Sequence, residues 1–279
     1  MAEFAKVQSK TVGDFKITYL NDGGAYVVPE AMYPASAEAG WGDYERLLAD
    51  DGRVVVSIGG FLIETGDQKI IMDLGFGPQT VEFPGFGPFI GGKFLESLAE
   101  TGVKPEEITD VVFSHLHLDH VGWTSNNGAL TFPNAKHMAT KADWDFWIKD
   151  ESGMGMHPEA VVPFLQEHLT FITAGHEIAP GMTVLDTPGH TPGHISFHIT
   201  AGDQEVYLIT DLLHCEVQFY EEDWHVPFDI DPAQGKATRE AIYPKLAKDN
   251  VLVADGHFAD HVFGTITMGE NGRPLWHPA

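Results

Sequence analysis

Three histidines and one aspartate lie within six residues of this sequence, in the order His-x-His-x-Asp-His. His115 and His117 are two residues apart, so on an extended turn both imidazoles can point at one ion. Asp119 and His120 then turn toward an adjacent ion. Imidazole and carboxylate together suit zinc, and also manganese, iron or cobalt. A loop of solvated histidines is the alternative, and we give it little weight because so many of these residues rarely cluster by chance.

Histidine and aspartate also recur where other short apolar runs end. VVF runs into SHLHLDH, TVL into DTPGH, YLI into TDLLH and VLVA into DGH. Residues just past the ends of buried strands gather at one edge of a sheet, where sites in α/β folds form. A hydrophobic core would not need such residues there, so the pattern indicates one polar site at that edge.

The elements that must position this site alternate along the chain as short apolar runs and helical patterns. The runs are rich in Val and Ile and are closed by Gly, Pro, Asp or Asn, as is typical of buried strands. The predicted strands are Val54–Ile63, Lys69–Met72, Asp110–Phe113, Lys136–Met138, Thr183–Leu185, Ile195–Ile199, Val206–Ile209 and Val251–Ala254. The predicted helices are Gly91–Thr101, Lys141–Asp150, Pro158–His168 and Asp231–Asp249.

Three further segments carry local signals. Gly75–Gly92 is dense in Gly, Pro and Phe, which predicts a long loop near the mouth of a pocket. The helix from Asp231 begins Asp-Pro, a good N-cap followed by proline at the first helical position. The segment after Phe263 predicts a final hairpin with Asn271-Gly272 as its turn.

Length and composition predict one large α/β domain over residues 1–279, with 43% hydrophobic residues to fill its core. We find no apolar run of about eighteen residues, which argues against a membrane helix. The N-terminus lacks the basic start and apolar stretch of a signal peptide. Cys215 is the only cysteine, which excludes an intrachain disulfide and agrees with a reducing, cytoplasmic compartment.

The charge balance bears on partners. Forty-one acidic residues against sixteen basic ones give a formal charge of -25. A polyanionic backbone is repelled by such a field, so nucleic acid is not an expected partner. The ordinary interpretation of the excess is a well-solvated acidic surface.

The motifs, taken as an ordered set, resemble the metallo-β-lactamase superfamily. After IIMDLG (Ile70–Gly75) come SHLHLDH, TPGHTPGH (Thr187–His194), ITDLLH (Ile209–His214) and ADGH (Ala254–His257), so the match covers nearly the whole chain. The resemblance implies an α/β fold, the αββα four-layer sandwich in which two β-sheets lie face to face with helices outside.

The same resemblance implies a centre of two divalent metal ions, with zinc as the first choice and manganese, cobalt or iron as alternatives. The first ion would be held by His115, His117 and His190, the second by Asp119, His120 and His257, with Asp211 bridging them. Asp73 would support the metal loop through a hydrogen bond to a ligand histidine. His194, four residues after His190, is expected to be structural and not a ligand.

Two such ions can share a hydroxide and polarise the electrophilic oxygen of a substrate, which supplies a nucleophile at neutral pH. No serine nucleophile is then needed, and we find no G-x-S-x-G motif. We expect hydrolysis of a small ester, lactone or phosphoester. Asp211 would hold the two ions together, and Asp119 would ligate the second ion and transfer a proton.

Within the superfamily, the chain resembles methyl parathion hydrolase and its lactonase relatives, through Thr210–Leu246, ADWDFW and GRPLW. This resemblance implies a homodimer and a small-molecule substrate, with Trp147 and His214 lining the substrate pocket beside the metals. Phe86, Phe89, Trp123 and Phe219 are further candidates for the pocket lining, although aromatic residues more often belong to the core.

Other functions of the same fold were weighed against this one. Dinuclear β-lactamases have cysteine where this chain has Asp211, so penicillin hydrolysis is not expected. A glyoxalase II-like thioesterase needs a basic cluster that we do not find. A mononuclear iron enzyme, such as a persulfide dioxygenase, is the alternative from another reaction class. The chain has every ligand expected for a second metal ion, namely Asp119, His120 and His257 with Asp211, and this favours the hydrolase over the mononuclear iron enzyme.

The position of His214 predicts a substrate ranking. Acyl homoserine lactonases of the superfamily typically have tyrosine three residues after the bridging aspartate, where its hydroxyl assists the opening ring. A phenolate-type leaving group needs little such help, so His214 predicts that aryl esters and activated phosphotriesters react faster than unactivated homoserine lactones.

Overall fold

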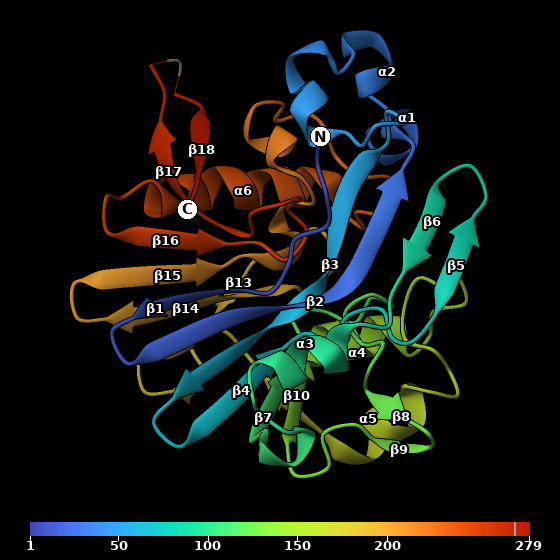
Figure 1. Ribbon diagram of the computed structural model, residues 1–279, viewed down its shortest axis with the longest axis vertical. Helices are drawn as coiled ribbons and strands as arrows, with labels where there is room; N and C mark the ends of the chain where they lie inside the picture. The colour runs from blue at the N-terminus through green and yellow to red at the C-terminus, as the bar shows by residue number, and fades with distance from the viewer. Residues whose placement is uncertain (271) are drawn as a thin grey trace.

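The computed structural model describes residues 1–270 and 272–279, and within them the long strands form a nine-stranded and a seven-stranded sheet (Figure 1). All strands of the first, which we name the N-terminal sheet, come from residues 8–172. All strands of the second, the C-terminal sheet, come from residues 177–278. The chain therefore completes one sheet before it begins the other.

The N-terminal sheet has the strand order β11-β10-β7-β4-β3-β2-β6-β5, with β1 paired to β2. Its strands are β1 (Gln8–Val12), β2 (Phe15–Val27), β3 (Val54–Thr65), β4 (Gln68–Met72), β5 (Thr80–Phe83), β6 (Gly87–Ile90), β7 (Asp110–Val112), β10 (Lys136–Thr140) and β11 (Leu169–Ile172). Strands β4, β7, β10 and β11 are parallel, and the other pairs are antiparallel.

The C-terminal sheet follows chain order and is antiparallel except for the pair β15–β16. Its strands are β12 (Glu177–Ala179), β13 (Met182–Asp186), β14 (Ile195–Ala201), β15 (Gln204–Leu208), β16 (Val251–Ala254), β17 (Phe263–Met268) and β18 (Pro274–Pro278). A small separate ribbon pairs β8 (Ser125–Asn126) with β9 (Ala129–Leu130).

The two sheets pack face to face around one apolar core, and helices cover their outer faces. Buried side chains of β2 to β4 meet those of β13 to β15 in this core. Helices α3 (Phe94–Glu100) and α5 (Val162–His168) pack on the outer face of the N-terminal sheet, and α6 (Pro232–Leu246) packs on the C-terminal sheet. The predicted αββα sandwich is therefore confirmed.

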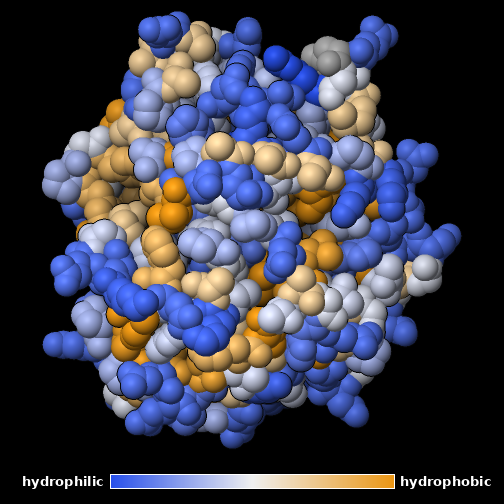
Figure 2. All heavy atoms as spheres, turned by 180° about the vertical axis from the view of Figure 1, so that it is seen from behind, coloured by the Kyte–Doolittle hydropathy of each residue, from blue (hydrophilic) through white to orange (hydrophobic). Residues whose placement is uncertain are grey.

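Shorter helices lie in the connections. They are α1 (Pro29–Met32), α2 (Ser36–Ala39), α4 (Lys141–Trp147), η1 (Gly42–Leu47), η2 (Pro105–Glu107), η3 (Thr210–Leu212) and η4 (Glu216–Phe219). Among the residues described, no helix is long and apolar enough to cross a membrane. The face shown in Figure 2 mixes many hydrophilic side chains with small apolar patches.

All eight predicted strands are present, with ends shifted by at most two residues. Helix α6 begins as expected, because the Asp231 side chain accepts a hydrogen bond from the backbone N–H of Gln234. The predicted loop Gly75–Gly92 was wrong in part, since it contains the hairpin β5–β6. The final hairpin is present as β17–β18, whereas Asn271 of its predicted turn lies outside the described residues.

The sequence pattern missed β1 and β2. Strand β2 is buried along most of its length, so its apolar and polar residues do not alternate. Its centre reads Asn-Asp-Gly-Gly, which is typical of a turn. In the structure this stretch is a β-bulge, in which Asp22 is the extra residue between the pairs Asn21–Gly59 and Gly23–Ile58.

Candidate metal centre

The segments that follow four strands converge at the edge where the two sheets meet. The segment after β7 brings His115, His117, Asp119 and His120. The connection from β13 to β14 brings His190, η3 after β15 brings Asp211, and the turn after β16 brings His257. All seven residues predicted as ligands thus lie in two adjoining groups.

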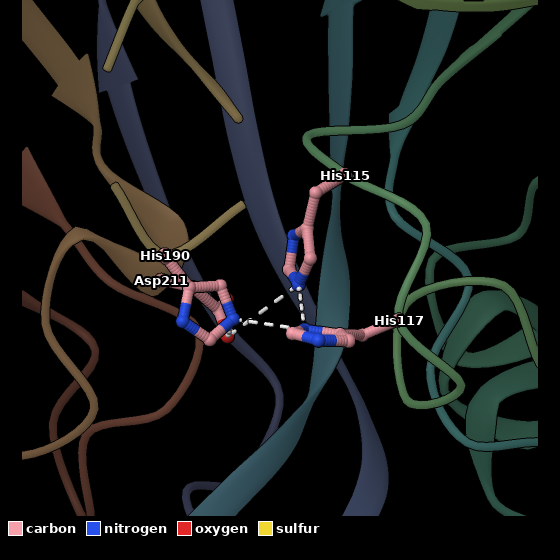
Figure 3. A group of neighbouring side chains, drawn as sticks. All are labelled: His115, His117, His190 and Asp211. Carbon is pink, nitrogen blue, oxygen red and sulfur yellow. Dashed lines mark hydrogen bonds and ion pairs between the residues drawn. The ribbon is translucent and has the colours of Figure 1, made fainter. Parts of the chain in front are cut away.

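The first group contains three histidines and one carboxylate, all buried (Figure 3). His117 Nδ1 lies 2.8 Å from His115 Nε2 and 2.8 Å from His190 Nε2. Asp211 Oδ2 lies 3.4 Å from His190 Nε2 and 3.7 Å from His115 Nε2. Ligand atoms about 2.0–2.2 Å from a tetrahedral ion lie about 3.4 Å from each other, so this group has the size of a metal site.

The second group contains Asp119, His120 and His257. Asp211 faces it with its other oxygen, because Oδ1 lies 3.1 Å from His120 Nε2 and 3.0 Å from His257 Nε2. Asp119 Oδ2 lies 3.8 Å from His120 Nε2 and is the most exposed member. Asp211 Oδ2 also lies 3.1 Å from His257 Nε2, so the carboxylate faces both groups, which is the arrangement of a bridging ligand.

Hydrogen bonds behind the histidines determine which ring nitrogen faces the centre. His120 Nδ1 donates to Asp73 Oδ2 at 3.0 Å, and His257 Nδ1 donates to the backbone carbonyl of Ser57 at 2.8 Å. Ser114 donates its hydroxyl proton to Asp73, so its oxygen accepts from His115 Nδ1. Because Nδ1 of His115, His120 and His257 carries these protons, Nε2 is the ring atom that faces the centre. His117 instead faces it with Nδ1.

Asp73, which the sequence predicted to support the metal loop, thus contacts both His120 and Ser114. It has a positive φ of 62°. A non-glycine residue in this region is strained, and such residues persist where the surrounding structure requires them.

The electrostatics favour a bound cation. Burial lowers the pKa values of His115, His117 and His190 well below the ordinary value, so these rings are neutral. Burial opposes ionisation of Asp211, but His120 and other neighbouring histidines hold its pKa well below the usual range. Neutral imidazoles around an ionised carboxylate are the donors that a divalent metal requires, so the residues present fit two such ions.

His257 and His120 behave differently without metal. Burial disfavours the charge on His257, but Asp211 outweighs this and raises its pKa to about 9. The same competition raises the pKa of His120 well above its usual value. Protons therefore occupy these nitrogens in the absence of a cation, and metal binding must displace them.

His194 stands outside both ligand groups. Its Nε2 lies 3.0 Å from Thr210 Oγ1, and its Nδ1 lies 2.9 Å from the backbone carbonyl of Thr187. Burial lowers its pKa to about 4. The ring therefore links the loop that carries His190 to the loop that carries Asp211.

An apolar cavity of about 270 Å³ opens directly on the centre. Its floor includes Asp119, Asp211 and His257. Its walls are apolar and aromatic: Val27, Met32, Val56, Phe83, Phe86, Phe89, Leu118, Met154, Pro227 and Phe228. Phe86 and Phe89 were expected here, whereas Phe83 and Phe228 were missed.

The other aromatic candidates occupy the interior. Trp147 packs behind His117, with ring centroids 4.6 Å apart, and does not line the cavity. Trp123 is buried and donates its indole N–H to Asp22. Phe219 stacks on Trp276 in the core beneath α6. The residue type alone does not tell a core aromatic from one that lines the cavity, because tertiary packing decides which aromatic rings reach the cavity.

His214 lines the cavity as predicted. Its Nε2 lies 3.2 Å from Asp211 Oδ2, and its ring lies nearly parallel to that of His257, 5.6 Å away. Within the described part of the chain, neither ring nitrogen of His214 has a hydrogen-bond partner. His214 therefore lies at the cavity floor beside the carboxylate that faces both groups, within reach of a substrate bound in the cavity.

Comparisons with known proteins agree with this fold and site. The sequence profile of the metallo-beta-lactamase superfamily matches residues 60–257. An N-acyl homoserine lactonase of a Bacillus species is 30% identical over 210 residues, which are 71% of this chain and 79% of that protein. N-acyl homoserine lactonase AiiA of Bacillus thuringiensis subsp. kurstaki is 28% identical over 211 residues, with the same coverage.

Two solved structures are similar over nearly the whole chain. AidC, a dizinc quorum-quenching lactonase in complex with a product, has a TM-score of 0.83 at 25% identity and covers 99% of this chain and 98% of its own. The hydrolase AbOPH has a TM-score of 0.81 at 26% identity with the same coverage. The chain belongs to the metallo-beta-lactamase superfamily. Within it, this protein is a metal-dependent hydrolase similar to lactonases.

Proposed function

We propose that the protein opens lactones that carry an apolar acyl chain, with N-acyl homoserine lactones as the first candidates. The observation that carries the proposal is the apolar cavity of about 270 Å³ that opens on the two ligand groups. Its apolar walls suit an acyl chain, and its polar floor suits the ester group that reacts. The relatives that are named as N-acyl homoserine lactonases support the same substrate class.

Two divalent ions held by the two groups would polarise the substrate carbonyl and supply a nucleophile at neutral pH. We propose zinc, because the donors are nitrogen and oxygen and the similar lactonase is described as dizinc. Asp211 would fix the distance between the ions. Asp119, the partly exposed carboxylate beside the cavity, would carry the proton to the leaving oxygen. A homodimer and a cytoplasmic location remain predictions from the sequence.

Hydrolysis of aryl esters or phosphotriesters is the second candidate. It is favoured by His214, which lies at the cavity floor where a tyrosine hydroxyl would assist ring opening. An iron dioxygenase is disfavoured, because Asp211 directs its second oxygen to a complete second group.

The deciding experiment compares N-decanoyl homoserine lactone, an aryl decanoate and a phosphotriester under identical loading with zinc, manganese or cobalt. We expect two metal ions per chain. Contrary to the ranking that His214 predicts from the sequence, we expect a kcat/KM for the lactone about tenfold or more above that for the aryl ester, because the relatives are named as lactonases. The opposite order would support the second candidate. One iron per chain and no hydrolysis would refute both.

A further inference from the structure

The buried carboxylate of Asp22 accepts five N–H hydrogen bonds, although it lies outside the ligand groups. Its Oδ2 accepts from the backbone of Phe76 and Gly77, at 2.8 and 3.0 Å. Its Oδ1 accepts from the backbone of Gly92 and Phe94, each at 2.9 Å. The indole of Trp123 is the fifth donor, also at 2.9 Å. Such a set must fix the position of every segment that donates to it.

The β-bulge in β2 explains how one side chain reaches these donors. Asp22 is the extra residue of the bulge, and bulges re-aim the side chain that they insert. The Asp22 side chain packs closely against the backbone of Gly75, since a Cβ added at Gly75 would lie 2.6 Å from Asp22 Oδ2. Gly75 also has a φ of +55°, so both its space and its backbone require glycine.

The four backbone donors flank the hairpin β5–β6, which forms one wall of the cavity. Phe76 and Gly77 precede the hairpin, and Gly92 and Phe94 follow it. Between these two attachment points the hairpin carries three wall residues, Phe83, Phe86 and Phe89. Asp22 therefore joins the start and the end of the segment that brings these aromatic rings to the cavity.

The hairpin has few other backbone attachments. Among the described residues, strand β6 pairs with β2 at two positions, Gly24–Ile90 and Ala25–Phe89, and the hairpin turn is held at one more point, where Val28 donates to the carbonyl of Phe86. In the described part of the chain, the one partner of strand β5 is β6, and the hairpin projects from the edge of the sheet in Figure 1. Because these attachments are few, how its base is held contributes strongly to its position relative to the cavity.

We propose that Asp22 is a positioning residue of the substrate cavity: by holding both ends of the β5–β6 hairpin, it sets the affinity for the apolar part of the substrate. The proposal rests on the proposed function only in assuming that the cavity takes an apolar chain. Asp22 does not contact the substrate itself, because it is fully buried and does not line the cavity.

Asp22→Asn is the sharpest variant, because it keeps the shape and removes one acceptor. The amide group would face either the two donors on Oδ2 or the three on Oδ1, and an NH₂ cannot accept from them. Trp123→Phe is the milder variant, since it removes one donor and leaves both ends of the hairpin attached. Asp14→Asn is the matched control, an identical change at an exposed position in the turn before β2.

The test measures kcat and KM with p-nitrophenyl esters from acetate to decanoate, together with the metal content of each variant. For Asp22→Asn we expect the KM of the decanoate to rise about tenfold, with kcat and the KM of the acetate within about twofold of wild type. Trp123→Phe should show the same pattern more weakly, and Asp14→Asn should show none. Metal content should not change.

Equal losses for acetate and decanoate, or a loss of metal, would show a general structural role and overturn the proposal. If Asp22→Asn does not fold, Trp123→Phe decides by the same comparison. The proposed function fails separately, when lactones are not opened although the esters are. If no ester is hydrolysed, calorimetric binding of N-decanoyl-L-homoserine gives the test, and equal affinity in Asp22→Asn and wild type refutes the proposal.

Discussion

Asp229 Oδ1 lies 2.8 Å from His190 Nδ1, and this contact turns His190 Nε2 toward the first ligand group. The Asp229 side chain is 3% exposed. Backbone bonds hold the two segments together, because Ile230 donates to the carbonyl of His190 and Asp231 to that of Gly189. The orientation of one ligand histidine is therefore determined by a carboxylate 39 residues away in sequence.

We expect Asp229→Ala to weaken metal binding at the first group by about 10–100-fold, because a ligand histidine that loses its carboxylate partner loses both orientation and basicity. The measurement is the metal retained per chain after dialysis against graded chelator. Asp231→Asn is the control, since asparagine caps α6 as well as aspartate does. Equal metal retention in Asp229→Ala and wild type would contradict the assignment.

Asp211→Ala and His194→Ala should separate a bridging ligand from a structural histidine. Asp211→Ala should lose most activity together with at least one metal equivalent, because both groups share this carboxylate. His194→Ala should keep its metal but lose about 1–3 kcal/mol of unfolding free energy, since it leaves buried hydroxyl partners unsatisfied. Metal analysis and denaturant unfolding check both. If His194→Ala loses metal as completely as Asp211→Ala, our choice of histidine is wrong.

His214→Tyr should raise lactone hydrolysis selectively. A tyrosine hydroxyl carries a proton at neutral pH, so it would present a donor to the alkoxide that leaves when the ring opens. We expect kcat/KM for N-decanoyl homoserine lactone to rise about tenfold, while that for an aryl ester stays nearly unchanged. His214→Phe, which has a ring but no donor, controls for shape. An equal gain in His214→Phe would exclude proton donation as the cause.

His137 should make the fold sensitive to mild acid. It is fully buried on β10, and neither ring nitrogen has a hydrogen-bond partner among the described residues. Burial lowers its pKa to about 4. The unfolded chain binds a proton at about pH 6.5 and the folded chain does not. Stability is therefore retained above that pH and decreases as the pH falls from about 6.5 toward 4, by up to about 3 kcal/mol.

Thermal unfolding of wild type and His137→Leu between pH 7.5 and 4.5, both with chelator, measures this effect. As the pH falls, the wild type should lose more unfolding free energy than His137→Leu does. Metal loss affects both proteins alike and cancels in the difference. A difference that does not depend on pH would show that His137 is not responsible.

The ligand cluster could be predicted from sequence because its residues follow apolar strands in a fixed order. Each of His190, Asp211 and His257 comes soon after a strand whose end is determined by its neighbours in the sheet. Local sequence therefore places them at one edge. Asp229 could not be found in this way, because it lies in an irregular segment that only the packing of α6 brings to His190.

Asp22 was missed for a related reason. Asn-Asp-Gly-Gly is typical of a turn, and the bulge that uses it becomes visible only when β3 is paired beside it. The five donors to Asp22 come from three distant segments. No local periodicity encodes such a set, so a buried acceptor of this kind is determined by tertiary structure.

The connection between the two sheets, residues 173–176, divides the ligands as well as the strands. The part of the chain before it contributes His115, His117, Asp119 and His120, and the part after it contributes His190, Asp211 and His257. Neither part alone has a complete group. If the chain were cut there and the two polypeptides were made separately, divalent metal would add its binding energy to their recombination. The enzyme would then reassemble in proportion to the available metal, and its activity would report metal concentration as a two-fragment sensor.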